Sequence, residues 1–99
     1  MCLSESLRIM PSVRITTEFC LNETVELGGV TVPAKQDMNI LIYLLHINPK
    51  EWIEPMKFVP ERFDSESKWS LTPAGTKRHP MSFGPFLGGK RICLGKSFA

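Results

Sequence analysis

The chain has 99 residues, of which 42% are hydrophobic and 22% charged, and its formal net charge is +2. This length suffices for one small domain with a modest core. A weakly basic charge balance argues neither for nucleic-acid binding nor strongly for an anionic membrane surface. Three cysteines without a C-x-x-C pair argue against a disulfide framework or a zinc knuckle and favour free thiols in a reducing compartment.

The first ten residues are predicted to form a helix, with Leu3, Leu7 and Met10 among its apolar positions. Pro11 ends this helix, because a proline ring disfavours helical backbone in the residue before it. The same stretch has neither a basic leader nor a long apolar core, so it does not resemble a signal peptide. The longest apolar run, residues 40–45, is far too short to cross a membrane.

A β-region is predicted over residues 12–45. Residues 12–17 suit a short strand. Two period-two apolar runs flank Gly28-Gly29 and predict a hairpin, because a tight hairpin turn requires positive φ. Residues 38–45 are apolar on both sides of the alternation and predict a buried strand.

A short helix is expected to begin at Asn48-Pro49 and to end before Pro55. Asn48 is a cap residue, Pro49 suits the first helical position, and Glu51 supplies an acid in the first turn. Residues 54–85 contain five of the eight prolines and show no hydrophobic period. They are therefore predicted to be a long ordered loop or a linker, and long loops in small domains are usually functional.

The glycine-rich stretch 86–97 partly resembles a phosphate-binding loop, which requires G-x-x-x-x-G-K-[ST]. Residues 84–90 fit, but Arg91 stands where the hydroxyl is needed. Gly95-Lys96-Ser97 supplies the ending, but its upstream partner, Gly89, is one residue too distant. Two prolines also stand where the preceding buried strand would lie, so the phosphate interpretation is rejected.

The same stretch suits a sulfur ligand at Cys93. A thiolate just before a helix N-terminus is favoured by the unpaired N–H groups there. Gly95 has no side chain to hold a flat cofactor away, and Gly88-Gly89 allow a tight bend. Arg91 is a planar cation that can pair a carboxylate, and Phe86 can cover the sulfur.

These positions carry a resemblance to a known family. The stretch matches F-x-x-G-x-R-x-C-x-G, the haem-binding signature of the cytochrome P-450 family, at Phe86, Gly89, Arg91, Cys93 and Gly95. Residues 5–8 resemble the family's E-x-x-R motif, and residues 60–63 resemble its P-E-R-F element. Weaker H-x-x-P and W-x-x-P elements lie between them at 46–49 and 52–55, in the family's order.

The resemblance implies a mainly α fold with small β-sheets, of which this chain is the C-terminal part. Its expected parts are the E-x-x-R helix (1–10), the β-region (12–45), the meander loop (54–85), the haem-ligand loop (86–95) and the start of the following helix (94–99). The long distal helix with its oxygen-activating threonine is expected to lie outside the chain. The isolated 99 residues are therefore expected not to fold stably.

The implied cofactor is haem b, with Cys93 as the axial thiolate and the sole metal ligand. Such a thiolate pushes electron density onto the iron and favours O–O cleavage. Arg91 is expected to pair a haem propionate and Phe86 to pack on the thiolate side. Arg14 holds the other propionate or is a solvent-exposed strand arginine. The cofactor-binding set is Phe86, Gly89, Arg91, Cys93, Gly95 and Arg14, and no catalytic residue besides the iron ligand is expected in the chain.

Glu5, Arg8 and Arg62 are expected to form a buried ion network that docks the loop before the cysteine and is structural rather than catalytic. Breaking one partner would leave a buried charge without compensation. Lys90 and Lys96 either attract an acidic reductase surface or are plain solvated lysines.

Six other residues are interpreted as pocket-lining or structural side chains. The residues just after Pro11 lie where the family lines its substrate pocket. The remaining two cysteines are interpreted as thiols without a ligand role, and the two histidines as structural. These residues are Ser12, Val13, Cys2, Cys20, His46 and His79.

The implied function is a haem-thiolate monooxygenase that takes electrons from a reductase, activates O2 and inserts one oxygen atom into an apolar organic substrate. The alternatives are a truncated non-catalytic remnant and a haem-thiolate sensor or isomerase. No nucleic-acid partner is expected. A eukaryotic parent is expected on the cytosolic face of the endoplasmic reticulum through an anchor outside this chain, and any other parent in the cytoplasm.

Overall fold

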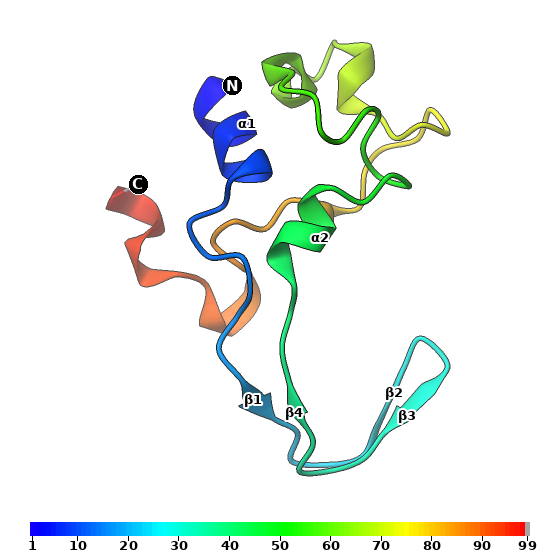
Figure 1. Ribbon diagram of the computed structural model, residues 1–99, viewed down its shortest axis with the longest axis vertical. Coiled ribbons are helices and arrows are strands. Elements are labelled where there is room, and N and C mark those ends of the chain that lie inside the picture. The colour runs from blue at the N-terminus through cyan, green and yellow to red at the C-terminus, as the bar shows by residue number, and fades with distance from the viewer. Residues whose placement is uncertain (99) are drawn as a thin grey trace.

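The computed structural model describes residues 1–98. Helix α1 (Cys2–Ile9) opens the chain, and β1 (Phe19–Cys20), β2 (Val25–Leu27), β3 (Val30–Val32), β4 (Asp37–Met38) and helix α2 (Ile42–His46) follow (Figure 1). The rest is irregular backbone with short 3₁₀ helices: η1 (Pro60–Phe63), η2 (Lys68–Ser70), η3 (Pro80–Ser82), η4 (Gly89–Arg91) and η5 (Leu94–Phe98). Within residues 1–98, none of the helices has the length and apolarity needed to span a bilayer.

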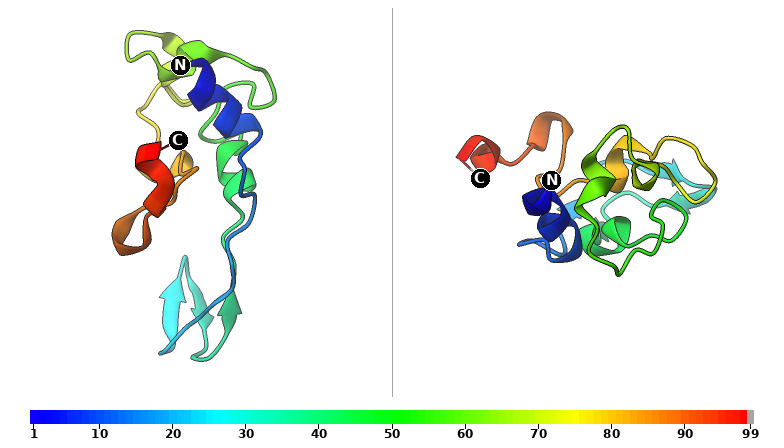
Figure 2. Two further views of the ribbon diagram at one scale, coloured as in Figure 1. Left: turned by 90° about the vertical axis from the view of Figure 1, so that its left-hand side faces the viewer. Right: turned by 90° about the horizontal axis from the view of Figure 1, so that it is seen from above.

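The β2–β3 hairpin has the turn and register that the sequence predicts. Val25 pairs with Val32, and Leu27 pairs with Val30. Gly28 and Gly29 have φ of 58° and 83°, the two positive values that a tight two-residue turn requires. A second antiparallel pair, β1 with β4, lies at the base of the hairpin. Figure 1 and the left view of Figure 2 place this unit at the end of the molecule opposite α1.

Two strand predictions are wrong. Residues 12–17 form no strand; Thr16 N–H donates to the Ile40 carbonyl (3.0 Å), and β1 begins only at Phe19. The strand predicted over 38–45 ends at Met38, and α2 occupies Ile42–His46. A short apolar run does not distinguish a strand from a helix by periodicity. Because part of residues 38–45 forms α2, the segment 12–17 has no strand there to pair with.

The helix predicted at Asn48 is a single turn. Trp52 N–H donates to the Asn48 carbonyl (2.9 Å), and the Asn48 side chain accepts from Lys50 N–H (3.0 Å). The predicted cap is therefore present, but the chain leaves the helical path at Trp52. Residues 54–85 form an ordered loop with three 3₁₀ turns and a bridge between Leu71 and Lys77, not a linker.

The helix start predicted at 94–99 is the 3₁₀ helix η5, and Ala99 lies outside the described residues.

The core is unusually polar for its size. Its buried hydrophobic residues are Ile42, Trp52 and Val59, whereas its buried polar residues are Glu5, Arg8, His46, Arg62, Thr72 and Ser82. Helix α1 packs against α2 and η1 around this cluster. The radius of gyration, 15.1 Å, exceeds the value of about 13 Å for a compact domain of 100 residues. The fold is therefore organised around a charged cluster and not around a large apolar core.

Candidate functional site

The glycine-rich loop is closed by its own backbone. Cys93 N–H donates to the Phe86 carbonyl (2.9 Å), and Leu87 N–H donates to the Gly84 carbonyl (3.0 Å). Gly89 has a φ of 67°, and Leu87 has a φ of 59°. A positive φ is uncommon for a residue with a side chain, so the bend at Leu87 is strained. The sequence pattern indicates the glycine bend but gives no sign of Leu87.

The loop presents the Cys93 thiol to solvent at the junction of η4 and η5. A Cβ added at Gly95 would lie 3.8 Å from the Cys93 sulfur, in ordinary van der Waals contact with it, so a side chain at this position would stand directly beside the thiol. Within residues 1–98 no three His, Cys, Asp or Glu side chains gather as a metal site would need. The exposed Cys93 sulfur, with no side chain at Gly95 beside it, fits a flat cofactor that carries its other ligands itself, as a porphyrin does.

The structure does not gather the other predicted cofactor residues, Arg91, Phe86 and Arg14, in one place. Arg91 lines a cavity of about 310 Å³ between the loop and the segment around β1, together with Phe19. Phe86 lines a second cavity, of about 280 Å³, between the loop and α1, with Leu7. Arg14 is exposed, and its guanidinium lies 5.6 Å from the Tyr43 ring. Arg14 and Arg91 thus do not share one of these cavities.

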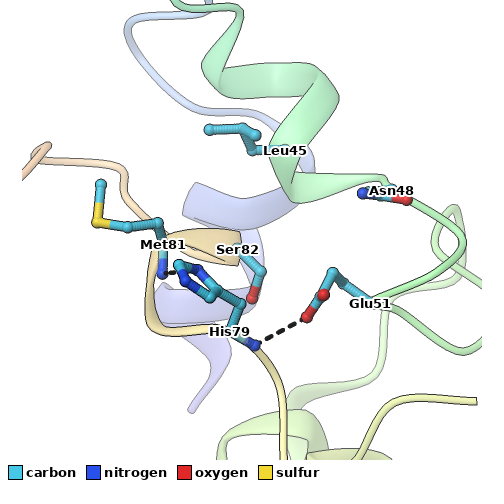
Figure 3. Close-up of a pocket in the computed structure, with 6 residues that line it drawn as sticks. All are labelled: Leu45, Asn48, Glu51, His79, Met81 and Ser82. Carbon is cyan, nitrogen blue, oxygen red and sulfur yellow. Dashed lines mark hydrogen bonds between the residues drawn. The ribbon is translucent and has the colours of Figure 1, made fainter. Parts of the chain in front are cut away.

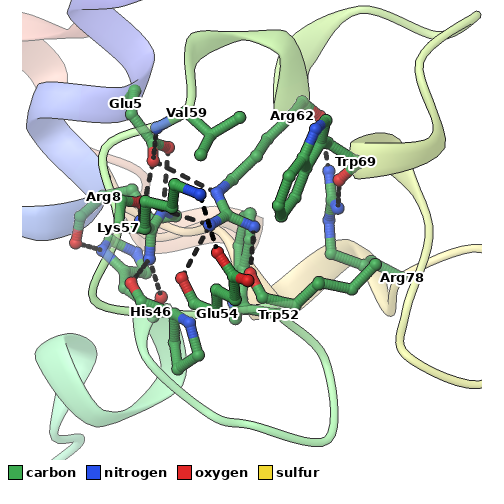
Figure 4. Close-up of polar contacts among 12 residues, drawn as sticks. Glu5, Arg8, His46, Trp52, Glu54, Lys57, Val59, Arg62, Trp69 and Arg78 are labelled. Carbon is green, nitrogen blue, oxygen red and sulfur yellow. Dashed lines mark hydrogen bonds and ion pairs between the residues drawn. The ribbon is translucent and has the colours of Figure 1, made fainter.

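The structure brings Glu5, Arg8 and Arg62 into direct contact (Figure 4). Both oxygens of Glu5 accept from Arg8, at 2.8 Å from Nε and 2.7 Å from Nη2. Glu5 Oε1 also accepts from Arg62 Nε (3.2 Å) and from Val59 N–H (2.9 Å). The three charged side chains are at most 1% exposed. One carboxylate therefore joins α1 to η1 across more than 50 residues of chain.

The two guanidiniums use their remaining donors on main-chain carbonyls. Arg8 Nη1 donates to His46 O (2.9 Å) and Pro55 O (2.6 Å). Arg62 Nη2 donates to Glu54 O (2.8 Å), and both arginines donate to Lys57 O (3.2 Å each). These bonds fix the path of residues 46–57 without using their side chains.

The electrostatics of the cluster depend on this pairing. Burial raises the pKa of Glu5, but the hydrogen bonds from Arg8 and Val59 N–H and the charges of Arg8 and Arg62 hold it below its ordinary value of 4.5. Burial and the like charge of Arg8 lower the pKa of Arg62, which Glu5 opposes. Glu5 is thus held ionised as the counter-charge of two buried guanidiniums.

Sequence reasoning missed a third arginine and two indole rings in this cluster. Arg78 donates to Arg62 O (2.6 Å) and Trp69 O (2.7 Å), and its guanidinium lies 4.3 Å from the Trp52 ring. Arg8 lies 5.0 Å from the same ring, and Arg62 lies 5.1 Å from the Trp69 ring. Aromatic faces attract buried cations. Only the W-x-x-P element hinted at Trp52, and no pattern indicates Arg78.

The two histidines lie in different environments. His46 is fully buried, and its ring centroid is 5.3 Å from that of Phe83. His79 is exposed beside a cavity of about 310 Å³ (Figure 3). Its backbone N–H donates to the Glu51 carboxylate (2.9 Å), and Nδ1 of its ring accepts from Met81 N–H (3.1 Å). The polar contacts of His79 are with Glu51 and Met81, whereas His46 accepts from Gly84 at the approach to the cysteine loop.

Comparison with known proteins gives the family. The cytochrome P450 family model matches residues 1–99. Similar curated proteins are probable cytochrome P450 4p2 of Drosophila melanogaster (36% identical over 98% of this chain), human cytochrome P450 4F8 (37% over 100%) and mouse cytochrome P450 3A25 (39% over 100%). The chain belongs to the cytochrome P450 family, the haem-thiolate monooxygenases. It spans 17–18% of the length of these three relatives.

Proposed function

We propose that these residues are the C-terminal part of a haem-thiolate monooxygenase that inserts one oxygen atom from O2 into an apolar organic substrate. The proposal rests mainly on the exposed Cys93 thiol, set on a loop that its own backbone closes in a chain of the cytochrome P450 family. When bound, haem b supplies the iron chemistry of oxygen activation, and the residues of this chain hold and orient it.

Each residue of the proposed site has one task. Cys93 binds the iron as a thiolate, and the missing side chain at Gly95 leaves room beside the sulfur. Gly89 makes the bend, with its φ of 67°. Arg91 pairs one propionate as a bidentate donor, and Phe86 shields the thiolate side from water.

Arg14 is proposed to pair the other propionate; its exposed guanidinium lies over the Tyr43 ring. The network of Glu5, Arg8 and Arg62 keeps the framework of the loop in place and takes no part in the chemistry.

The partners follow from the proposed reaction. A reductase supplies two electrons, and the exposed Lys90 and Lys96 offer positive charge to an acidic surface on it. For a eukaryotic parent protein we propose a location on the cytosolic face of the endoplasmic reticulum, and for any other parent protein the cytoplasm.

The test uses the full-length protein that carries these residues. Its reduced, carbon-monoxide-bound form should show the red-shifted band of thiolate-ligated haem, and Cys93→Ser should abolish the band. Cys20→Ser is the matched control, because Cys20 is also an exposed free thiol but lies on β1, and it should leave the band intact. Loss of the band in both variants, or in neither, contradicts the assignment of Cys93.

Oxygen consumption then separates the possible activities. A monooxygenase consumes O2 in step with substrate and reductase. A haem-thiolate sensor or isomerase shows the band without coupled consumption, and a non-catalytic remnant takes up no haem.

A further inference from the structure

We propose that His46 is a positioning residue for the cysteine loop, which it fixes by binding the Arg8 carbonyl through one ring nitrogen and the Gly84 N–H through the other. The loop's role as an iron-ligand loop rests on the proposed function, whereas the anchoring itself rests on the contacts alone. The ring is fully buried between α1 and the segment that enters the loop.

The two hydrogen bonds of the ring fix its tautomer. Gly84 N–H lies 3.0 Å from Nε2 of His46, and a backbone N–H only donates, so Nε2 is the acceptor. The ring proton is therefore on Nδ1, which lies 3.2 Å from the Arg8 carbonyl and donates to it. A neutral imidazole with both nitrogens bound is held in one orientation, and the Phe83 ring packs beside it.

The hydrogen bonds continue from the ring toward Cys93. Gly84, which donates to the ring, accepts at its own carbonyl from Leu87 N–H (3.0 Å). Phe86, the neighbour of Leu87, accepts from Cys93 N–H (2.9 Å). The strained bend at Leu87 thus lies between Gly84 and Cys93. Strained backbone persists only where its surroundings hold it, and His46 holds the near end.

The other end of the anchor is rigid as well. Arg8 accepts from the ring of His46 through its carbonyl and donates to the His46 carbonyl through Nη1 (2.9 Å). Its guanidinium is in turn bound by Glu5. The buried ion network therefore reaches the segment that enters the cysteine loop through one imidazole.

Two amide substitutions separate the two bonds of the ring. Glutamine at this position reaches about as far as Nε2 and keeps an acceptor for Gly84. Asparagine is shorter; it keeps a donor for Arg8 but leaves the buried Gly84 N–H without an acceptor, which is costly. Asparagine also leaves a cavity, so His46→Leu, which fills the space of the ring but has no acceptor, is added as a packing control. If His46 only fills space, His46→Leu should behave like His46→Gln. If His46 anchors the loop, His46→Leu and His46→Asn should both be worse than His46→Gln.

The experiment compares His46→Gln, His46→Asn, His46→Leu and, as control, His79→Gln in the full-length haem protein. The first readout is the fraction of haem with the red-shifted band after reduction and carbon monoxide binding. His46→Gln and His79→Gln should keep this fraction near the wild-type value, and His46→Asn should lower it severalfold. Equal values in His46→Gln and His46→Leu would overturn the proposal.

Amide hydrogen exchange over residues 83–87 is the second readout, and it does not depend on haem ligation. Exchange in His46→Asn should be about threefold to tenfold faster than in His46→Gln, as expected for one lost buried hydrogen bond. If the wild-type protein shows no thiolate band, the proposed function fails, whereas this difference in exchange still supports the anchor. Equal exchange rates refute the anchor even if the band is present.

Discussion

The charged core makes a sharp prediction about Glu5→Gln. This change keeps the shape of the side chain but removes its charge and replaces one acceptor oxygen by an NH2 donor. Glu5 accepts four hydrogen bonds, three of them on Oε1. Even if the new amide turns its oxygen to the three-donor side, its NH2 group faces Arg8 Nε. Arg8 and Arg62 then remain buried without a counter-charge.

The expected magnitude follows from this geometry. Removing one partner of a buried pair costs about 3–5 kcal/mol, a large share of the total stability of about 5–15 kcal/mol that a folded domain has. Glu54→Gln is the matched control. Glu54 pairs with Lys57 at the same i,i+3 spacing as Glu5 with Arg8, but its pair is 56–61% exposed. An exposed pair contributes less than about 1 kcal/mol.

The assay is guanidinium unfolding of the full-length protein, followed by far-UV circular dichroism with wild type, Glu5→Gln and Glu54→Gln in parallel. The midpoint should fall strongly for Glu5→Gln and hardly for Glu54→Gln, with similar slopes. Similar midpoints for the two variants would refute the argument that burial, and not sequence spacing, gives the network its strength.

Three further predictions concern other parts of the fold. Burial chiefly lowers the pKa of His46 below its ordinary value of 6.5, so on acidification the unfolded chain binds this proton before the folded chain does. The contribution of His46 to the free energy of unfolding should therefore be constant well above pH 6.5 and fall as the pH drops below it, and His46→Gln should reduce the slope of stability against pH in that range. Arg78→Lys should destabilise by about 1–3 kcal/mol, because an ammonium cannot keep both carbonyl bonds and the stacking on Trp52; Lys77→Arg, next to it and exposed, should be neutral in the same thermal melt. Gly29→Ala has free space but a φ of 83°, so strain alone should cost about 1–2 kcal/mol without changing the thiolate band; a neutral melt would show that the turn relaxes.

Sequence reasoning succeeded where local chemistry decides the structure. The proline after α1 and the two glycines of the hairpin act within a few residues, and both elements are where they were predicted. It failed at α2, because an apolar run without alternation suits a helix as well as a strand. Leu41 and Leu44 are 47% and 52% exposed, so the run is not buried on both faces as predicted.

The candidate site shows the same division. The spacing of Glu5 and Arg8 indicates a helix pair, but the contact of Arg62 with Glu5 came from the resemblance and not from spacing. Arg78 and Leu87 carry no motif, because a stacked guanidinium and a strained φ depend on tertiary packing. The roles of Cys93, Arg91 and Arg14 toward haem remain predictions.

The main-chain bonds of Arg8 and Arg62 have a consequence for how this region can change. Both arginines bind carbonyls between residues 46 and 57, and every amino acid offers a carbonyl. Side chains such as Met56 and Lys57, which are exposed, are therefore replaceable without loss of these bonds. Adding or removing a single residue would shift every carbonyl out of reach. The segment 46–57 should therefore tolerate substitutions at its exposed positions but not insertions or deletions.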